Sequence, residues 1–488
     1  MKPLFEQALS TKPKAQARRS SSALSRPEFR FQFGSDWRFS RSCAGSNGWV
    51  PPFEDQDFDA DLDTFARHFQ RPLSSLQVDL LWLGLAVYFA DRFAPRRPFG
   101  LNASPHWRRS IRVSIPVSHY GQWLAVKSQL EEILSFLTED DWEIDARPGR
   151  QQTNCESQQW WKHAETQIGG RFALFSGGLD SLAGVLDQLG TSAHPWTLIS
   201  GQTNTRMKAK QQDCVMSIRQ RFPEVVAWLP VEYGMKCKLD ASAMEPTQRT
   251  RAFIHVILGV VAALSSSACE LHLFENGIGG FNLPVDYSQL GSQTSRGTHP
   301  AFLNRMAGLV EKVFDTPFRI MNPYLFMTKG QMCSSASVQR NSDLVNLTFS
   351  CDRFPNYTRK EYQCGVCSSC LLRRVSTHAA QINEPASSYS TDITAHARLS
   401  RGADEMAFFR TSSQALEMRI LLDSSDPWNA LCGAYPWLRK SLPEAAQQSG
   451  TTHDEAAARI VSLYSTYWKE WECFASLRSS SSQLALSS

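Results

Sequence analysis

The chain has 488 residues and a formal net charge of +4, with pI near 8.4. The length allows about two to four domains, and the small net charge gives no indication of a nucleic-acid partner. The longest apolar run, residues 253–264, is too short to cross a bilayer, and no secretory h-region follows Met1. We therefore expect a cytoplasmic protein with no membrane partner, whose 12 cysteines stay reduced.

The first 150 residues divide into a polar arm and a folded segment. Residues 1–28 are rich in Lys, Arg, Ser and Gln, which is typical of a mobile arm. Residues 29–150 contain a buried-helix pattern at 79–93, an alternating strand at 110–117, and a helix leading to a strand over 122–144. We find no clustered nucleophile, metal set or phosphate loop there. This pattern predicts an N-terminal α+β accessory domain that acts as a scaffold or binds a partner.

Strand and helix patterns alternate from about residue 170. Apolar stretches at 172–175, 196–200, 225–231 and 270–277 are separated by helical patterns. This order predicts an α/β fold with a doubly wound parallel sheet, in a domain over residues 165–385 that follows a Gln-rich linker. Residues 388–488 show helical patterns and a Ser-rich end, which predicts a C-terminal helical domain with a frayed tail.

The stretch SGGLDS, residues 176–181, joins the first of these strands to an amphipathic helix. A glycine-rich turn at a helix N-terminus binds phosphate, because the backbone can approach the ligand and free N–H groups face it. The turn lacks the closing Gly-Lys-Ser/Thr of a Walker loop and the G-x-G-x-x-G spacing of a dinucleotide fingerprint. An ordinary tight turn is the alternative interpretation.

SGGLDS resembles the pyrophosphatase loop, or PP-loop, of adenine-nucleotide α-hydrolase-like enzymes, which cut ATP between its α and β phosphates. The main-chain N–H groups and the serine hydroxyls can cradle a leaving pyrophosphate. Asp180 can hold Mg²⁺ against the phosphates, since a hard cation prefers oxygen ligands. The predicted ATP-binding residues are Ser176, Gly177, Gly178, Leu179, Asp180 and Ser181.

A cysteine cluster lies downstream, with one distant cysteine and a C-x-x-C-x-x-C knuckle: Cys351, Cys364, Cys367 and Cys370. Four thiolates close a tetrahedral structural zinc site that leaves no position for substrate. An iron–sulfur cluster and free thiols are the alternatives. In the ferredoxin run a proline follows the fourth cysteine, whereas Leu371 follows the last cysteine here. We predict Zn²⁺ at this cluster.

The order of these two motifs resembles that of 7-cyano-7-deazaguanine synthase, the QueC family. The resemblance covers residues 171–381 and includes the stretches TLISGQTNTRMKAKQ, EPTQRTRAFIHVILG, NPYLFMTKGQM and LTFSC. It implies an ATP-dependent C–N ligase that adenylates the carboxylate of 7-carboxy-7-deazaguanine and passes the acyl group to an amine. The implied cofactors are ATP, Mg²⁺ and Zn²⁺.

The resemblance also implies roles for single residues. Asp180 is the expected catalytic residue of the loop, and Mg²⁺ with Arg249 or Lys329 offsets the charge that develops on the phosphates. The family's Pro-Gly-Arg-Asn is replaced by residues 247–250, TQRT, which leaves open which nearby arginine meets ATP or substrate. For His299, which precedes a proline, a structural role is the alternative. The candidate substrate-binding residues are Arg251, Glu275, Asn276, Thr298 and His299.

The flanking regions distinguish this chain from single-domain members of that family. WRRSIRVSIPVS and FLTEDDWEI resemble the QatC group of QueC-like proteins from bacterial anti-phage operons. This resemblance implies a deazaguanine substrate, protein partners from a defence operon and a possible homodimer.

The acceptor amine stays open between ammonia and a partner protein. The aromatic-rich C-terminal helices are expected to bind such a partner and to be dispensable for adenylation. The alternatives are a non-catalytic nucleotide-binding sensor or scaffold and a tRNA-modifying PP-loop enzyme.

Overall fold

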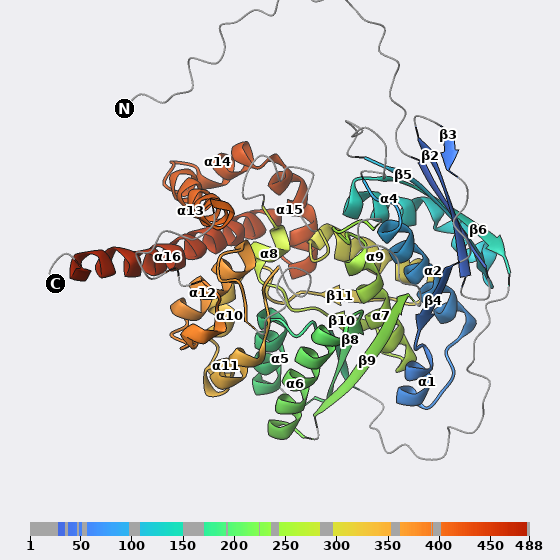
Figure 1. Ribbon diagram of the computed structural model, residues 1–488, viewed down its shortest axis with the longest axis horizontal. Helices are drawn as coiled ribbons and strands as arrows, with labels where there is room; N and C mark the ends of the chain where they lie inside the picture. Colours follow the sequence, from blue (N-terminus) through green and yellow to red (C-terminus); the bar gives the residue numbers. More distant parts are fainter. Residues whose placement is uncertain are drawn as a thin grey trace, which may run out of the picture.

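The computed structural model describes residues 28–34, 38–45, 48–50, 56–96, 108–149, 170–191, 194–223, 225–235, 244–283, 296–352, 362–391, 393 and 402–485. Within these ranges an 11-stranded sheet is flanked by helices (Figure 1). The predicted polar arm lies outside the described residues apart from Glu28.

One half of the sheet is parallel and carries the strands predicted from about residue 170. Its order is β11-β10-β7-β8-β9, so the strand order reverses between β10 and β7. The strand predicted at 270–277 is shorter than expected, because Asn276 caps helix α8 (Gly277–Phe281). The five strands are β7 (Arg171–Leu174), β8 (Trp196–Gln202), β9 (Val226–Met235), β10 (Glu270–His272) and β11 (Arg319–Met321).

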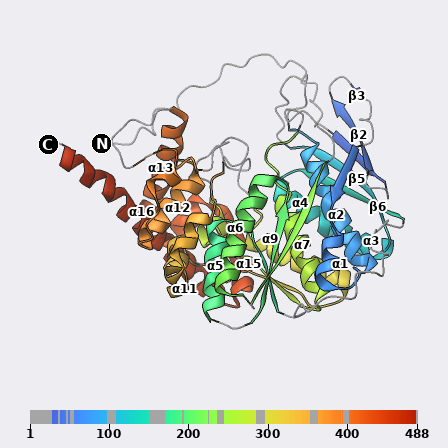
Figure 2. The ribbon, with the colours of Figure 1, turned by 60° about the horizontal axis from the view of Figure 1, so that its bottom comes forward.

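Helices cover both faces of this parallel half. Helices α5 (Leu179–Thr191) and α6 (Thr205–Arg221) pack on one face, and α7 (Arg251–Ser265) and α9 (Pro300–Phe314) pack on the other (Figures 1 and 2). The alternation of strand side chains explains the two layers: Phe172 belongs to the core beneath α7, and Ala173 belongs to the core beneath α5.

The N-terminal region extends the same sheet. β4 (Gln56–Ala60) pairs antiparallel with β9, and the order continues through β2 (Arg38–Gly45), β1 (Glu28–Phe33), β5 (Ser110–Val117) and β6 (Asp141–Pro148), with β3 (Gly48–Val50) beside β2. The buried helix predicted at 79–93 is α2 (Ser75–Arg92), and the helix predicted before β6 is divided into α3 (Tyr120–Ala125) and α4 (Lys127–Thr138); α1 (Asp63–Phe69) precedes them.

Helix α2 packs directly on α7, so the N-terminal region and the parallel half share one hydrophobic core. A Cβ on Gly84 of α2 would lie within 2.9 Å of the Cδ1 atoms of Ile254 and Ile257 on α7, so a larger residue there would require these side chains to move.

A buried ionic cluster fixes the N-terminal strands. Three antiparallel pairings, β9 with β4, β4 with β2 and β2 with β1, reverse the strand direction, and β5 and β6 run parallel to β1. The starts of β5 and β6 therefore lie at the sheet edge where the parallel strands end. There the Arg109 guanidinium lies 2.6 Å from Asp91 and 2.5 Å from Asp140, and Arg96 lies 2.9 Å from Asp140. These side chains are at most 3% exposed, so each charge depends on its partners for compensation.

The C-terminal helices have a core of their own but also pack on the α/β part. They are α13 (Gly402–Leu422), α14 (Pro427–Ala434), α15 (Pro436–Ser449) and α16 (His453–Ala485), and they lie on the side of the parallel half opposite β1–β6 (Figures 1 and 2). Three aromatic residues of these helices, Tyr435, Tyr464 and Tyr467, are buried in this core. No helix in the described ranges is long and apolar enough to cross a bilayer.

Helix α15 is attached to α9 and β11 by side-chain hydrogen bonds. Asn304 Nδ2 donates to Glu444 Oε2 at 2.6 Å, and Gln448 Nε2 donates to the Ile320 carbonyl at 2.9 Å. The remaining helices are α10 (Lys329–Cys333), α11 (Ala336–Arg340), α12 (Ser368–Ala379) and two short 3₁₀ turns at Ser342–Leu347 and Ala386–Ser388.

The buried ionic cluster predicts a large loss of stability in Asp140→Asn. Arg109 would keep Asp91, but Arg109 and Arg96 would both lose the buried carboxylate that they share, and we expect a fall of about 3–5 kcal/mol in the free energy of unfolding, measured in urea. Asp141→Asn is the matched control, because Asp141 pairs with Arg108 on the surface, where both side chains are more than a third exposed. That exposed pair should contribute less than about 1 kcal/mol.

The same cluster predicts how stability changes with pH. Burial alone would raise the pKa of Asp140, but the charges and hydrogen bonds of Arg109 and Arg96 outweigh it and lower that pKa. The stabilisation is therefore complete above the unfolded-state pKa of about 4 and is lost as the pH falls further. The difference in the free energy of unfolding between wild type and Asp140→Asn should therefore become smaller below about pH 4. A difference that stays constant in acid would contradict this assignment.

Candidate functional site

The SGGLDS turn joins β7 to α5 at the carboxyl edge of the parallel strands. Gly177 has φ +80°, a conformation that side chains disfavour, and the backbone there runs close to Gln211. The Ser176 hydroxyl accepts from the Gly178 N–H at 3.2 Å, and the Ser181 hydroxyl donates to the Gly178 carbonyl at 2.9 Å. The two serines thus hold the glycine turn against the first turn of α5, which begins at Leu179.

Asp180 is the centre of a polar cluster built from three separate elements. Lys329 Nζ, in the first turn of α10, lies 2.7 Å from Asp180 Oδ2. Asn276 Nδ2, at the cap of α8, donates to Asp180 Oδ1 at 2.9 Å and lies 2.8 Å from Glu275 Oε1. These residues follow β7, β10 and β11, which are neighbours in the sheet, so the fold brings them together.

The charges in this cluster depend on one another. Lys329 is 5% exposed; burial opposes its charge, but the carboxylates of Asp180 and Glu275 outweigh that effect and raise its pKa. Burial and the neighbouring Asp180 raise the pKa of Glu275 to about 8. The group therefore contains a cationic lysine paired with Asp180, and a Glu275 carboxyl that takes up a proton more readily than an exposed one.

Arg249 lies in a different environment from Asp180. Its guanidinium donates to the Thr138 carbonyl at 3.3 Å and lies 3.8 Å from Glu139, beside the buried ionic cluster. Burial and Arg96 lower the pKa of Arg249 to about 10. Arg251, in the first turn of α7, is exposed. Among the described contacts, none joins either arginine to Asp180.

His299 and Thr298 stand at the start of α9. The His299 ring accepts from the Ala301 N–H at 3.1 Å, and its other nitrogen lies 2.9 Å from the Ser441 hydroxyl of α15. Burial lowers the pKa of His299 to about 3, so the ring is neutral and both nitrogens are engaged. This geometry is that of a helix cap. The Thr298 carbonyl faces α8, 3.9 Å from the position that a Cβ on Gly280 would take.

The four predicted zinc ligands meet in one buried cluster. Their sulfur atoms all lie within 4.8 Å of one another. Cys364 Sγ and Cys370 Sγ are 3.8 Å apart, the separation expected of thiolates about 2.3 Å from a tetrahedral Zn²⁺. Backbone N–H groups of Cys364 and Cys367 point at neighbouring sulfurs at 3.4 and 3.3 Å, which favours thiolate charge. The donor set therefore fits a closed structural zinc site.

The cysteine cluster is connected to the phosphate loop. Phe349, just before Cys351, donates its N–H to the Gly177 carbonyl at 3.1 Å. Arg373 of α12 is 1% exposed and donates to Thr348 Oγ1 at 2.7 Å and to the Val345 carbonyl at 2.8 Å. The segment that precedes Cys351 thus packs against the SGGLDS loop. The sequence analysis assigned no role to Arg373. Its position three residues after the predicted zinc ligand Cys370 was the feature of the sequence that could have indicated one.

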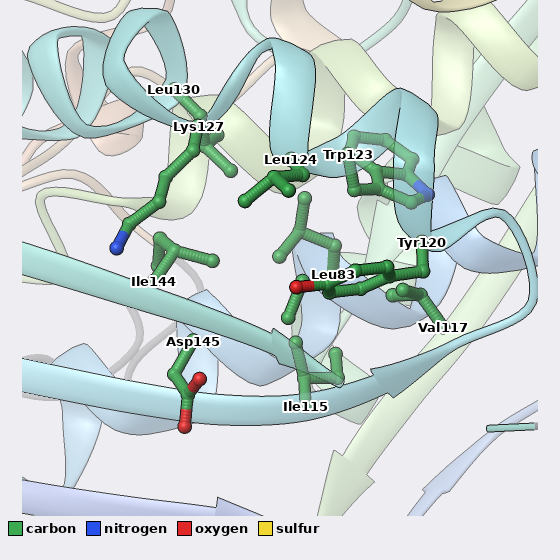
Figure 3. A pocket seen from close by; sticks show the side chains of 11 residues that line it. Leu83, Ile115, Val117, Tyr120, Trp123, Leu124, Lys127, Leu130, Ile144 and Asp145 are labelled. Carbon is green, nitrogen blue, oxygen red and sulfur yellow. The ribbon is translucent and has the colours of Figure 1, made fainter. Parts of the chain in front are cut away.

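A separate hollow lies between α3, α4 and strands β5 and β6 (Figure 3). Apolar side chains such as Leu83, Ile115 and Leu130 line it. Lys127 and Asp145 are its charged lining residues. None of the site residues predicted from the sequence lines this hollow.

Residues 295–381 match the family described as "QueC: Queuosine biosynthesis protein QueC". The matched region contains Lys329 and the four clustered cysteines, whereas SGGLDS lies outside it. No curated protein and no solved structure matches the chain. The match supports a QueC-like region in this protein, and the QueC family suggests an ATP-dependent C–N ligase type of enzyme.

The cysteine cluster predicts about one Zn²⁺ per chain, measured by elemental analysis of the purified protein. Cys367→Ser should remove the metal and lower the unfolding temperature, because metal affinity at such a site is folding free energy. Cys269→Ser is the control, since Cys269 is exposed and lies outside the cluster. A brown protein that contains iron and sulfide in place of zinc would refute the assignment.

Proposed function

We propose that this protein is an ATP-dependent ligase that adenylates the carboxylate of 7-carboxy-7-deazaguanine. The observation that carries the proposal is the pairing of Asp180 with Lys329 and Asn276 beside the glycine turn. The reversal of strand order between β10 and β7 supports a doubly wound PP-loop fold, in which ligands bind at the switch point outside the carboxyl ends of the strands. The QueC match over residues 295–381 supports the choice of substrate.

In this proposal the loop residues bind the phosphates of ATP. The N–H groups at residues 177–179 and the hydroxyls of Ser176 and Ser181 cradle the leaving pyrophosphate. Asp180 would hold Mg²⁺, which neutralises phosphate charge when bound. Lys329 is positioned by Asp180 and supplies a further positive charge where negative charge develops.

The proposed reaction has two steps. A carboxylate oxygen of the deazaguanine attacks the α-phosphorus of ATP, the bond to the β-phosphate oxygen breaks, and pyrophosphate leaves. An amine then attacks the acyl carbon of the adenylate, and AMP leaves as the amide forms. Arg251 and Glu275 remain candidates for substrate contact, because Arg251 is exposed and Glu275 adjoins the Asp180 cluster.

We also propose a role in anti-phage defence, in which the acceptor amine belongs to a partner protein. The sequence resemblance to the QatC group and the additional N-terminal and C-terminal regions support it. Ammonia as the acceptor would instead give the amide and, after a second adenylation, the nitrile. Mass spectrometry of the small-molecule products and of candidate partner proteins after incubation with ATP, Mg²⁺ and the deazaguanine distinguishes the two.

The proposed reaction predicts AMP and pyrophosphate as the nucleotide products, measured by chromatography. Asp180→Asn should lower their formation at least about 100-fold, since the loop loses the charge that holds both Mg²⁺ and Lys329. Asp213→Asn is the control, because Asp213 is an exposed carboxylate on α6. ADP and phosphate as the only products would contradict adenylation, and ATP binding without turnover would favour a sensor or scaffold.

A further inference from the structure

Helix α16 reaches the candidate site at two points on one of its faces. Leu463 lies against Gly277, where a Cβ would be 2.5 Å from its Cδ2 atom, and Glu470 lies against Gly330, where a Cβ would overlap the carboxylate. The two side chains are about two helical turns apart and so project from the same face of α16. At Gly330 a side chain would occupy the space that the Glu470 carboxylate fills, and at Gly277 a Cβ would meet both Leu463 and the Leu325 carbonyl oxygen.

These two glycines adjoin the two partners of Asp180. Gly277 follows Asn276, whose amide binds one carboxylate oxygen of Asp180, and Gly330 follows Lys329, whose ammonium binds the other. Helix α16 therefore packs beside both residues that hold Asp180, although it is remote from them in the sequence.

Glu470 also makes a polar contact with the start of α10. The Thr328 hydroxyl donates to Glu470 Oε1 at 2.5 Å and accepts from the Gln331 N–H at 3.0 Å, which caps the helix whose first residue is Lys329. The second carboxyl oxygen of Glu470 is buried without a hydrogen-bond partner among the described residues. The contact thus orients the Thr328 hydroxyl and packs α16 against the first turn of α10, which contains Lys329.

We propose that Leu463 and Glu470 are positioning residues that hold Asn276 and Lys329 around Asp180, so that the C-terminal helical region is part of the adenylating machinery. This inference rests on the proposed function for its catalytic consequence. It replaces the expectation that the C-terminal helices are dispensable for adenylation.

The first test compares Leu463→Ala and Glu470→Ala with the neighbouring exposed controls Ser462→Ala and Glu472→Ala. Both test variants should lower kcat for AMP formation about 10- to 100-fold, since small displacements of catalytic groups are costly. KM for ATP should change less, zinc content should remain that of the wild type, and the controls should keep full activity. Wild-type kcat in both folded test variants would overturn the proposal.

A double-mutant cycle tests the Glu470 contact itself. In Gly330→Ala the new methyl group should displace the Glu470 carboxylate from Thr328 and lower kcat. In the Glu470→Ala background that space is free, so the added effect of Gly330→Ala should be small and the two effects should not add. Fully additive effects would show that Gly330 and Glu470 act independently and would refute the contact as the route of positioning.

Hydrogen exchange tests the positioning role of α16 independently of the proposed adenylating activity. Amides of α8 and α10 should exchange faster in Leu463→Ala and Glu470→Ala, respectively, than in the controls, with or without any turnover. If the wild type forms no AMP from ATP and the deazaguanine, the proposed function fails, while faster exchange still supports α16 as the element that orders the site. Unchanged exchange at both helices would overturn the positioning role even in an active enzyme.

Discussion

The geometry of the candidate site depends on how the negative charge of the Asp180 carboxylate is balanced by neighbouring groups. Each of its oxygens has a partner, and the partners come from the segments that follow two other strands. A largely buried ion pair is stable only when its partners are held in place, because removal of either leaves an uncompensated charge. The loop after β7 and the segments after β10 and β11 must therefore keep a common arrangement, and the packing around them serves that requirement.

Two remote parts of the chain support this arrangement from different sides. The segment before Cys351 binds the Gly177 carbonyl, so the cysteine cluster, when it holds its metal, braces the turn itself. Helix α16 contacts the glycines that follow Asn276 and Lys329. The loop and the partners of Asp180 are thus contacted by different segments, but the segments are linked, because Trp471 and Phe474 of α16 belong to the same buried cluster as the four cysteines.

The N-terminal region is a structural continuation of the parallel half. Its strands extend the sheet beyond β9, and α2 shares a core with α7. The buried charges of Arg109 and Asp140 lie where β5 and β6 begin, at the same edge of the sheet as the phosphate loop. Arg249 donates to the Thr138 carbonyl and lies close to Glu139, so its position depends on the N-terminal region even though it lies in the sequence of the parallel half.

The sequence by itself determined the features that are encoded locally. The strand patterns from residue 170, the glycine turn of residues 176–181 and the C-x-x-C-x-x-C knuckle are short-range, and the structure contains them, with the last predicted strand shortened to Glu270–His272. The tertiary structure alone decided which distant segments meet. Periodicity along one segment carries no information about its partner, so the joining of β4 to β9, the engagement of His299 by Ser441 and the approach of Glu470 to Thr328 could not be predicted.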